Sequence, residues 1–256
     1  MLESIAWYAP AIGGAVYLLT PFLLHNSFRL AARCWIQAMP LDRLPKETSA
    51  EIRRRICEFA NLGFELAGIF DCGVLTNETH SYVACFCNHT TNEFGNVTAM
   101  VTSEGTASYF EFSSRFSDGR SIETNSNGIL PLMPANPEIR VFRFASVEEP
   151  RTLLPLHRQL TEKYAPGLCA LGEPRDAEIQ RYVRTIEGSG PRLAVAGYMK
   201  TDETGDSFRL TWRGAVRMAW LGLWPVTFLR KTIHRHAMEL ERQSLQTRAE
   251  AALQKA

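Results

Sequence analysis

A run of twenty uncharged residues near the N-terminus constrains this chain more than any other sequence feature. From Ile5 to Leu24 the sequence is IAWYAPAIGGAVYLLTPFLL, and about 20 apolar residues in a helix match the hydrocarbon thickness of a bilayer. Pro10 and Pro21 disfavour a soluble helix but are better tolerated inside membranes. The four residues MLES before the run lack the basic residues of a signal peptide. The sequence therefore predicts a transmembrane segment within a membrane anchor over residues 1–38.

Aromatic and basic residues flank this run as they flank membrane-spanning helices. Trp7 and Tyr8 lie where an interfacial aromatic belt is expected. Arg29 and Arg33 follow the run, whereas Glu3 is the charged side chain that precedes it. By the positive-inside rule, we expect a single-pass membrane protein with its N-terminus outside and its main domain in the cytoplasm.

A second apolar segment, residues 212–232, lies toward the other end of the chain. Twelve uncharged residues separate Arg217 from Arg230, too few to cross a bilayer. We expect an interfacial amphipathic helix in the headgroup layer, kinked at Pro225 because proline lacks a backbone donor. A buried core helix is the alternative. The expected membrane contacts in this segment are Trp220, Trp224, Phe228, Arg230 and Lys231. They add to those near the N-terminus, which are Trp7, Tyr8, Arg29 and Arg33.

The central residues 48–211 have the pattern of a cytoplasmic α+β domain. A helix is expected over Ala50–Leu62, capped by Thr48 or Ser49. Stretches rich in aromatic and β-branched residues predict strands at 64–70, 81–87, 96–102, 107–116, 120–125 and 139–147, and a final hairpin at 192–200 and 207–212. Sequential hairpins next to helices predict an antiparallel β-meander backed by helices. Residues 39–47 form the expected linker, and 233–256 a polar C-terminal helix or tail that frays.

Cysteines and histidines form the only cluster with the residue types of a reactive site. Alternation along a strand places Cys85, Cys87 and His89 on one face, and Cys72 and His80 could approach across a hairpin. However, C-x-C-x-H is not a usual zinc spacing, and cysteine is a common buried residue. We therefore expect no metal and no cofactor here, with Cys85 and Cys87 packed inward. A metal or redox protein, or an enzyme using this region, is the alternative.

Other polar residues are interpreted without a functional role. The sequons at Asn77, Asn88 and Asn96 are taken as chance occurrences, because glycosylation needs a domain outside the cytoplasm. Three acidic residues that occur singly on expected strands are taken as solvent-facing: Glu65, Glu111 and Glu123.

Charge and motifs narrow the class of function. Lys and Arg number 28 against 27 Asp and Glu, so the overall charge does not favour nucleic acid as a partner. The glycines form neither a P-loop nor a dinucleotide fingerprint, and there is no G-x-S-x-G or H-E-x-x-H. The expected function is a membrane-tethered, non-catalytic binding or scaffolding protein, or an accessory subunit that contacts the bilayer and other membrane-protein subunits. A lipid- or cofactor-binding module is a further alternative.

Overall fold

The chain folds into two compact units, each assembled from separate stretches of sequence. The computed structural model describes residues 2–33, 36–76, 79–103, 105–172 and 175–253. Unit 1 comprises Met1–Cys34, Leu130–Ala135 and Arg184–Lys231, and unit 2 comprises Trp35–Ile129, Asn136–Val183 and Thr232–Ala256. Residues 184–211, which were expected within the central domain, thus belong to the same unit as the N-terminal helix.

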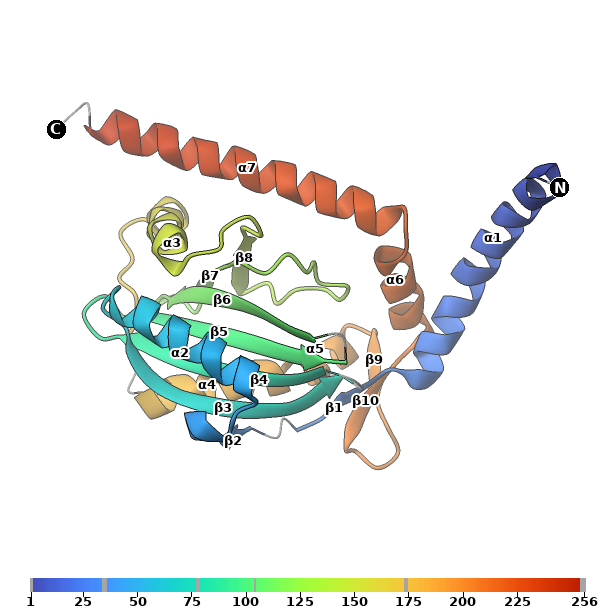
Figure 1. Ribbon diagram of the computed structural model, residues 1–256, viewed down its shortest axis with the longest axis horizontal. Helices are drawn as coiled ribbons and strands as arrows, with labels where there is room; N and C mark the ends of the chain where they lie inside the picture. Colours follow the sequence, from blue (N-terminus) through green and yellow to red (C-terminus); the bar gives the residue numbers. More distant parts are fainter. Residues whose placement is uncertain (1, 34–35, 77–78, 104, 173–174, 254–256) are drawn as a thin grey trace. The chain divides into compact units, whose positions relative to one another are not determined.

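Unit 2 is built on a seven-stranded sheet (Figure 1). The strands lie side by side in sequence order, which is the arrangement expected of a meander. Their bounds are β2 (Gln37–Ala38), β3 (Glu65–Thr76), β4 (Thr79–Asn88), β5 (Glu93–Thr102), β6 (Gly105–Arg115), β7 (Ser121–Asn125) and β8 (Ile139–Arg143). The predicted α+β class with a mostly antiparallel sheet is confirmed.

The last strand departs from the meander. β8 pairs with β7 in parallel, with Ser121 opposite Ile139 and Asn125 opposite Arg143. A parallel neighbour cannot be reached by a tight turn, so the chain makes a longer crossover between the two strands. Six residues of that crossover, Leu130–Ala135, belong to unit 1.

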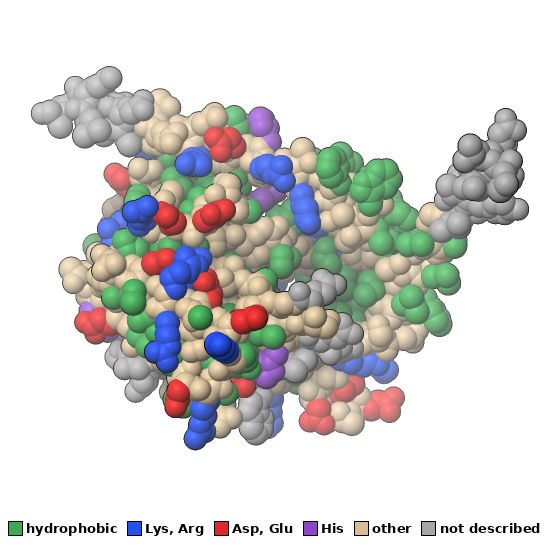
Figure 2. All heavy atoms as spheres, in the orientation of Figure 1, with side chains coloured by type: hydrophobic (Ala, Val, Ile, Leu, Met, Phe, Trp, Pro, Cys, Tyr) green, Lys and Arg blue, Asp and Glu red, His purple; other side chains and the backbone are tan. Residues whose placement is uncertain are grey.

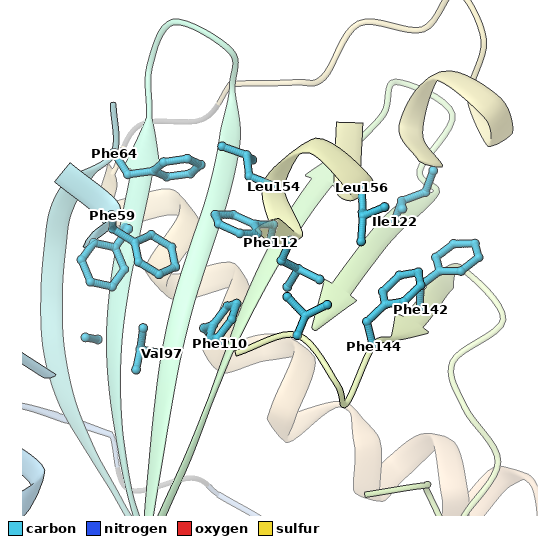
Figure 3. Packing of buried hydrophobic residues seen from close by; sticks show 14 of the residues in the cluster. Phe59, Phe64, Val97, Phe110, Phe112, Ile122, Phe142, Phe144, Leu154 and Leu156 are labelled. Carbon is cyan, nitrogen blue, oxygen red and sulfur yellow. The ribbon is translucent and has the colours of Figure 1, made fainter. Parts of the chain in front are cut away.

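One face of the seven-stranded sheet is covered by two helices, α2 (Lys46–Ala60) and α3 (Pro150–Tyr164) (Figure 1). Ile52 and Phe59, which are seven residues apart on α2, are fully buried on the side of the helix that faces the sheet. Phe59 stacks on Phe86 at 4.4 Å between ring centroids and contacts Phe112 at 5.1 Å. Figure 3 shows Phe59 among other phenylalanines of this core, including Phe64, Phe110 and Phe112. The residue before α2 is Pro45, and no side chain caps the helix, so the cap expected at Thr48 or Ser49 is wrong.

The other face of the sheet carries a smaller apolar cluster. Val83, Cys85 and Cys87 alternate along β4 and pack with Ala67 and Cys72 of β3. Ile179 of α4 (Arg175–Glu187) packs against this cluster. Both faces are therefore buried, which explains why β4 is apolar without interruption from Tyr82 to Cys87 rather than at alternate positions.

The expected C-terminal helix is present, and its residues from Thr232 onward belong to unit 2. α7 spans Val226–Leu253, and its Leu245 is 2% exposed within the main core. Lys163 of α3 donates a hydrogen bond to Glu241 at 2.7 Å, and Tyr164 donates to the same carboxylate at 3.1 Å. Leu245, the partly buried Met238 and a charged anchor thus hold this largely polar helix.

Unit 1 combines a small sheet with three further helices. Its antiparallel strands are ordered β1 (Arg29–Ala31), β10 (Ser207–Leu210) and β9 (Met199–Thr201). Its helices are α1 (Leu2–Ser27), α5 (Ser189–Val195) and α6 (Trp212–Gly222), followed by the start of α7. The sequence 192–200 had been expected as a strand, but its first half lies in α5. Residues within the expected anchor form β1, because Leu30 packs with Phe208, Leu210 and Met199 in the core of this unit.

Within the described residues, no helix is both long and apolar enough to cross a membrane. The transmembrane part of the expected fold class is therefore unsupported.

We predict that Leu245→Ala lowers the free energy of unfolding by roughly 2–5 kcal/mol, because it leaves a cavity in a packed core. Leu240→Ala, at a site that is 52% exposed on the same helix, is the matched control and should change stability by less than about 0.5 kcal/mol. Urea denaturation measures both. Equal effects of the two substitutions would show that α7 does not pack on unit 2 through Leu245.

Candidate functional site

The pairing of α1 with α6 is the centre of unit 1. Leu24 of α1 points into the core of this unit. Tyr17 meets Trp220 edge-on at 5.9 Å between ring centroids, and its hydroxyl donates a hydrogen bond to the carbonyl of Trp224. His25 stacks on Trp212 at 4.5 Å. Aromatic side chains from both helices therefore interdigitate along one seam.

Small residues fix the orientation of α6. Thr211 caps the helix by accepting a hydrogen bond from the amide of Gly214 at 3.2 Å. A Cβ at Gly214 would lie 2.1 Å from the carbonyl oxygen of Tyr198, so glycine is required at this close approach. Ala215 and Ala219 are buried on the same side of the helix.

Large apolar side chains occupy the outer side of α6. Trp212, Val216 and Trp220 recur at four-residue intervals and are each more than half exposed. The sequence-based set of contacts missed Trp212 and Val216, although the four-residue interval of Trp212, Val216 and Trp220 is itself an amphipathic signal.

The outer side of α1 is also apolar. Leu18 is 79% exposed, and Val16, Leu19, Phe22 and Leu23 are exposed as well. Of the seventeen exposed large apolar side chains among the described residues, twelve belong to unit 1. Figure 2 shows apolar side chains gathered over α6 and the described part of α1. Soluble proteins rarely expose a large contiguous patch of this kind, so the surface indicates an interaction site.

The helix expected over 212–232 is divided in two. α6 ends at Gly222, and α7 begins at Val226, so Pro225 marks a break rather than a kink. Trp224 lies in this break, so Trp220, Trp224 and Phe228 do not share one face of a single helix. All three side chains are nevertheless exposed, as a membrane-contact role requires.

The basic residues expected at the membrane have different surroundings. Arg230 is half-buried and donates to the carbonyls of Pro131 at 2.8 Å and Leu221 at 3.1 Å, so it holds the crossover segment. Arg29 is half-buried in β1 and donates to the carbonyl of Phe28 at 2.9 Å. Arg33 and Lys231 are exposed.

The remaining two expected membrane contacts lie in the first part of α1. Trp7 and Tyr8 are within the helix, but their side chains lie outside those that the structure describes.

The charge of the chain is divided unequally between its units. Unit 1 contains ten Lys and Arg against five Asp and Glu, a net charge of +5. Unit 2 contains eighteen Lys and Arg against twenty-two Asp and Glu, a net charge of −4. The balanced total that the sequence analysis relied on therefore hides a basic unit that also carries the exposed apolar surface.

The cysteine cluster is part of a core. Cys85 is fully buried, Cys72 and Cys87 are nearly so, and His89 is exposed beyond the end of β4. The described residues contain no group of three metal-ligating side chains. A cavity of about 20 Å³ between Cys87, His89 and Glu93 has room for about one water molecule.

A histidine that sequence reasoning missed lies in the main core of unit 2. His157 of α3 is fully buried; its Nε2 is 2.9 Å from the Ser114 hydroxyl and its Nδ1 is 3.0 Å from the Thr124 hydroxyl. Burial lowers the pKa of His157 to about 4, against the opposing field of the Glu93 carboxylate. Enclosure by core side chains makes this neutral imidazole a structural hydrogen-bonding group.

A carboxylate expected in solvent is held within the sheet. Glu111 of β6 is half-buried and accepts hydrogen bonds from the amides of Asn96 and Asn125, each at 3.0 Å. The expected solvent-facing position of Glu111 is therefore wrong, and Glu123 is also half-buried, whereas Glu65 is exposed. Cross-strand pairing explains the contacts, because Asn96 lies opposite Glu111 and Glu111 opposite Asn125.

The sequon asparagines have structural surroundings where they are described. Asn88 is buried and accepts hydrogen bonds from the amides of Thr90 at 3.0 Å and Thr91 at 3.1 Å. Asn96 is buried and donates to Glu111. Asn77 lies outside the described residues.

Comparison of the chain with protein-family models, with curated proteins and with solved structures gave no match.

We predict that unit 2 loses stability as the pH falls through the titration range of histidine. An unfolded histidine binds a proton near pH 6.5, whereas the native His157 stays neutral down to about pH 4. The stability that depends on neutral His157 is therefore complete above the unfolded pKa and is lost on acidification. Between pH 7 and pH 5 the free energy of unfolding should fall by about 2 kcal/mol, as measured by urea denaturation.

His157→Gln should flatten this pH dependence, because the amide keeps hydrogen-bonding atoms but does not titrate. His236→Gln, at an exposed position on α7, is the control and should leave it unchanged. A slope that survives in His157→Gln would exclude His157 as its source.

Proposed function

We propose that this protein is a membrane-tethered binding protein or accessory subunit, attached to the cytoplasmic face of a membrane by unit 1. The observation that carries the proposal is the concentration of exposed apolar side chains on α1 and α6. Lipid is the partner that suits this surface best, because it accepts an apolar patch of irregular outline together with flanking cations.

The two helices have complementary roles in this attachment. α1 inserts: its sequence from Ile5 to Leu24 is uncharged, and its described outer side exposes Leu18, Leu19 and Phe22. α6 lies in the headgroup layer, where tryptophan is favoured because its ring is amphipathic. Full burial of one such apolar side chain contributes about 1.5–3 kcal/mol, so a few of them suffice for stable attachment.

Charge supports both the lipid surface and the orientation. The net +5 of unit 1 favours an anionic leaflet, which is typical of the cytoplasmic side. Arg29 and Arg33 follow α1 and accord with the same side under the positive-inside rule. Unit 2, with a net −4, is repelled by that surface and remains in solvent for partner subunits.

Flotation of the full chain with liposomes tests the proposal. The wild type should float with the vesicles, whereas the triple variant Leu19→Gln, Phe22→Gln, Leu23→Gln should partition at least about a hundredfold more weakly, since three apolar contacts are lost. Glutamine keeps a good helix propensity, so α1 can still form. Circular dichroism checks that both proteins are folded.

A matched variant separates a specific surface from general hydrophobicity. Leu66→Gln, Ile129→Gln and Leu171→Gln change three exposed apolar side chains of unit 2 and should leave flotation unaffected. Failure of the folded wild type to float, or equal loss in both triple variants, would overturn membrane attachment through unit 1.

A further inference from the structure

A groove of about 530 Å³ lies along the outer side of α6, entirely within unit 1. This volume is in the range of small-molecule sites. Successive turns of α6 line the groove, and Tyr198, the residue before β9, lines it as well. The lining residues are Tyr198, Trp212, Arg213, Val216, Arg217, Trp220 and Leu221.

Two arginines on adjacent turns give one part of the groove a positive charge. Arg213 lies over the Tyr198 ring at 4.5 Å and donates to the Tyr198 hydroxyl and to the Ala196 carbonyl, both at 3.3 Å. Arg217 lies over the same ring at 5.5 Å. The tyrosine thus positions both guanidinium groups toward the same space.

These arginines have hydrogen-bonding capacity left over. The Nε of Arg217 is buried and has no hydrogen-bond partner among the described residues. No carboxylate of the residues that the structure describes forms an ion pair with Arg213 or Arg217. A buried guanidinium N–H without an acceptor costs free energy, so an oxyanion in the groove would satisfy it and balance the charge.

The remainder of the groove is apolar. Trp212, Val216 and Trp220 form a stripe along the groove, each more than half exposed. Trp212 also touches His25 and Phe22 of α1, so this stripe is continuous with the apolar surface of that helix. A ligand that fills the groove therefore has an anionic group at one place and apolar chains that lead toward α1.

We propose that the groove binds one anionic phospholipid of the membrane, with its phosphate on Arg213 and Arg217 and its chains along Trp212, Val216 and Trp220. This inference rests on membrane attachment by unit 1 and adds a headgroup preference to it. The two guanidinium groups oppose a choline or ethanolamine cation. The favoured headgroup is therefore one with net negative charge, such as phosphatidylglycerol.

The experiment measures lipid binding by the full chain in a neutral detergent. No bilayer is present there, so membrane attachment through α1 does not contribute to the measured binding. Short-chain phosphatidylglycerol or phosphatidylcholine is added, and binding is followed by native mass spectrometry and tryptophan fluorescence. The wild type should retain one molecule of phosphatidylglycerol in preference to phosphatidylcholine, with a change in tryptophan emission. Glycerol phosphate, which has no chains, should not compete.

Two variants and a control assign the preference to the groove. Arg213→Gln with Arg217→Gln should weaken phosphatidylglycerol binding roughly thirtyfold, since each basic residue contributes about 1 kcal/mol at an anionic headgroup. Val216→Glu, which places a carboxylate in the groove and leaves both arginines in place, should also abolish the preference. Arg184→Gln with Lys200→Gln removes the same charge from exposed positions of unit 1 and should change binding less than about threefold.

The outcomes separate this proposal from membrane attachment itself. Equal binding of the two lipids, equal effects of the two charge variants, or release by glycerol phosphate would overturn the lipid site while flotation of the wild type still supports attachment. Loss of flotation with neutral and anionic vesicles alike would overturn attachment. If the arginine pair lowers stability, the Val216→Glu variant decides the result, because that position is exposed and its substitution does not disturb the core.

Discussion

The close approach of α6 to the backbone of Tyr198 determines which side chains unit 1 exposes. A Cβ at position 214 would lie 2.1 Å from the Tyr198 carbonyl oxygen, so the helix sits at this distance only with glycine there. Once Gly214 faces the sheet, Ala215 and Ala219 must also face inward. Trp212, Val216 and Trp220, which recur at four-residue intervals, must then face outward. The apolar surface is thus a geometric consequence of small residues packed on the opposite side of the same helix. An exposed tryptophan stripe is stable in this position because the buried side of α6 supplies the folding energy.

The segregation of charge between the units depends on the order of the chain rather than on its composition. Basic residues gather in the C-terminal part of unit 1, where α6 and the start of α7 carry Arg213, Arg217, Arg230 and Lys231. Some of these cations act within the fold: Arg192 and Arg230 donate to the carbonyls of Pro134 and Pro131 and so hold the crossover from β7 to β8. Others have donors left for a ligand. Net charge alone cannot separate these two uses, whereas hydrogen-bond partners do.

Local patterns in the sequence predicted the elements well and their assembly less well. Alternation and aromatic content placed β3 to β7, and helical spacing placed the buried side of α2, because these signals depend on neighbours in the chain. The parallel partner β8, the docking of α7 through Leu245 and the buried Glu111 depend on residues far apart in sequence. His157 was not recognised because a lone histidine on an amphipathic helix gives no signal until Ser114 and Thr124 are placed beside it. For the candidate site, the sequence indicated Trp220, Trp224 and Phe228 but not the groove, since Tyr198 lines it from the segment between α5 and β9.

The chain passes between the two units repeatedly, and this connectivity limits how attachment is separated from folding. Unit 1 takes its strands from both ends of the sequence, with Leu30 of β1 opposite Phe208 of β10. Removal of residues 1–38 would therefore delete the strands β1 and β2 and part of the core together with the exposed part of α1. α7 contributes residues to both units within one continuous helix. Cleavage of the chain near Lys231 would therefore break this helix. Substitutions at the exposed positions of α1 and α6 avoid both effects, because they keep β1 and α7 in the chain and leave the fully buried side chains unchanged. For this topology, point changes isolate the role of the apolar surface where truncation cannot.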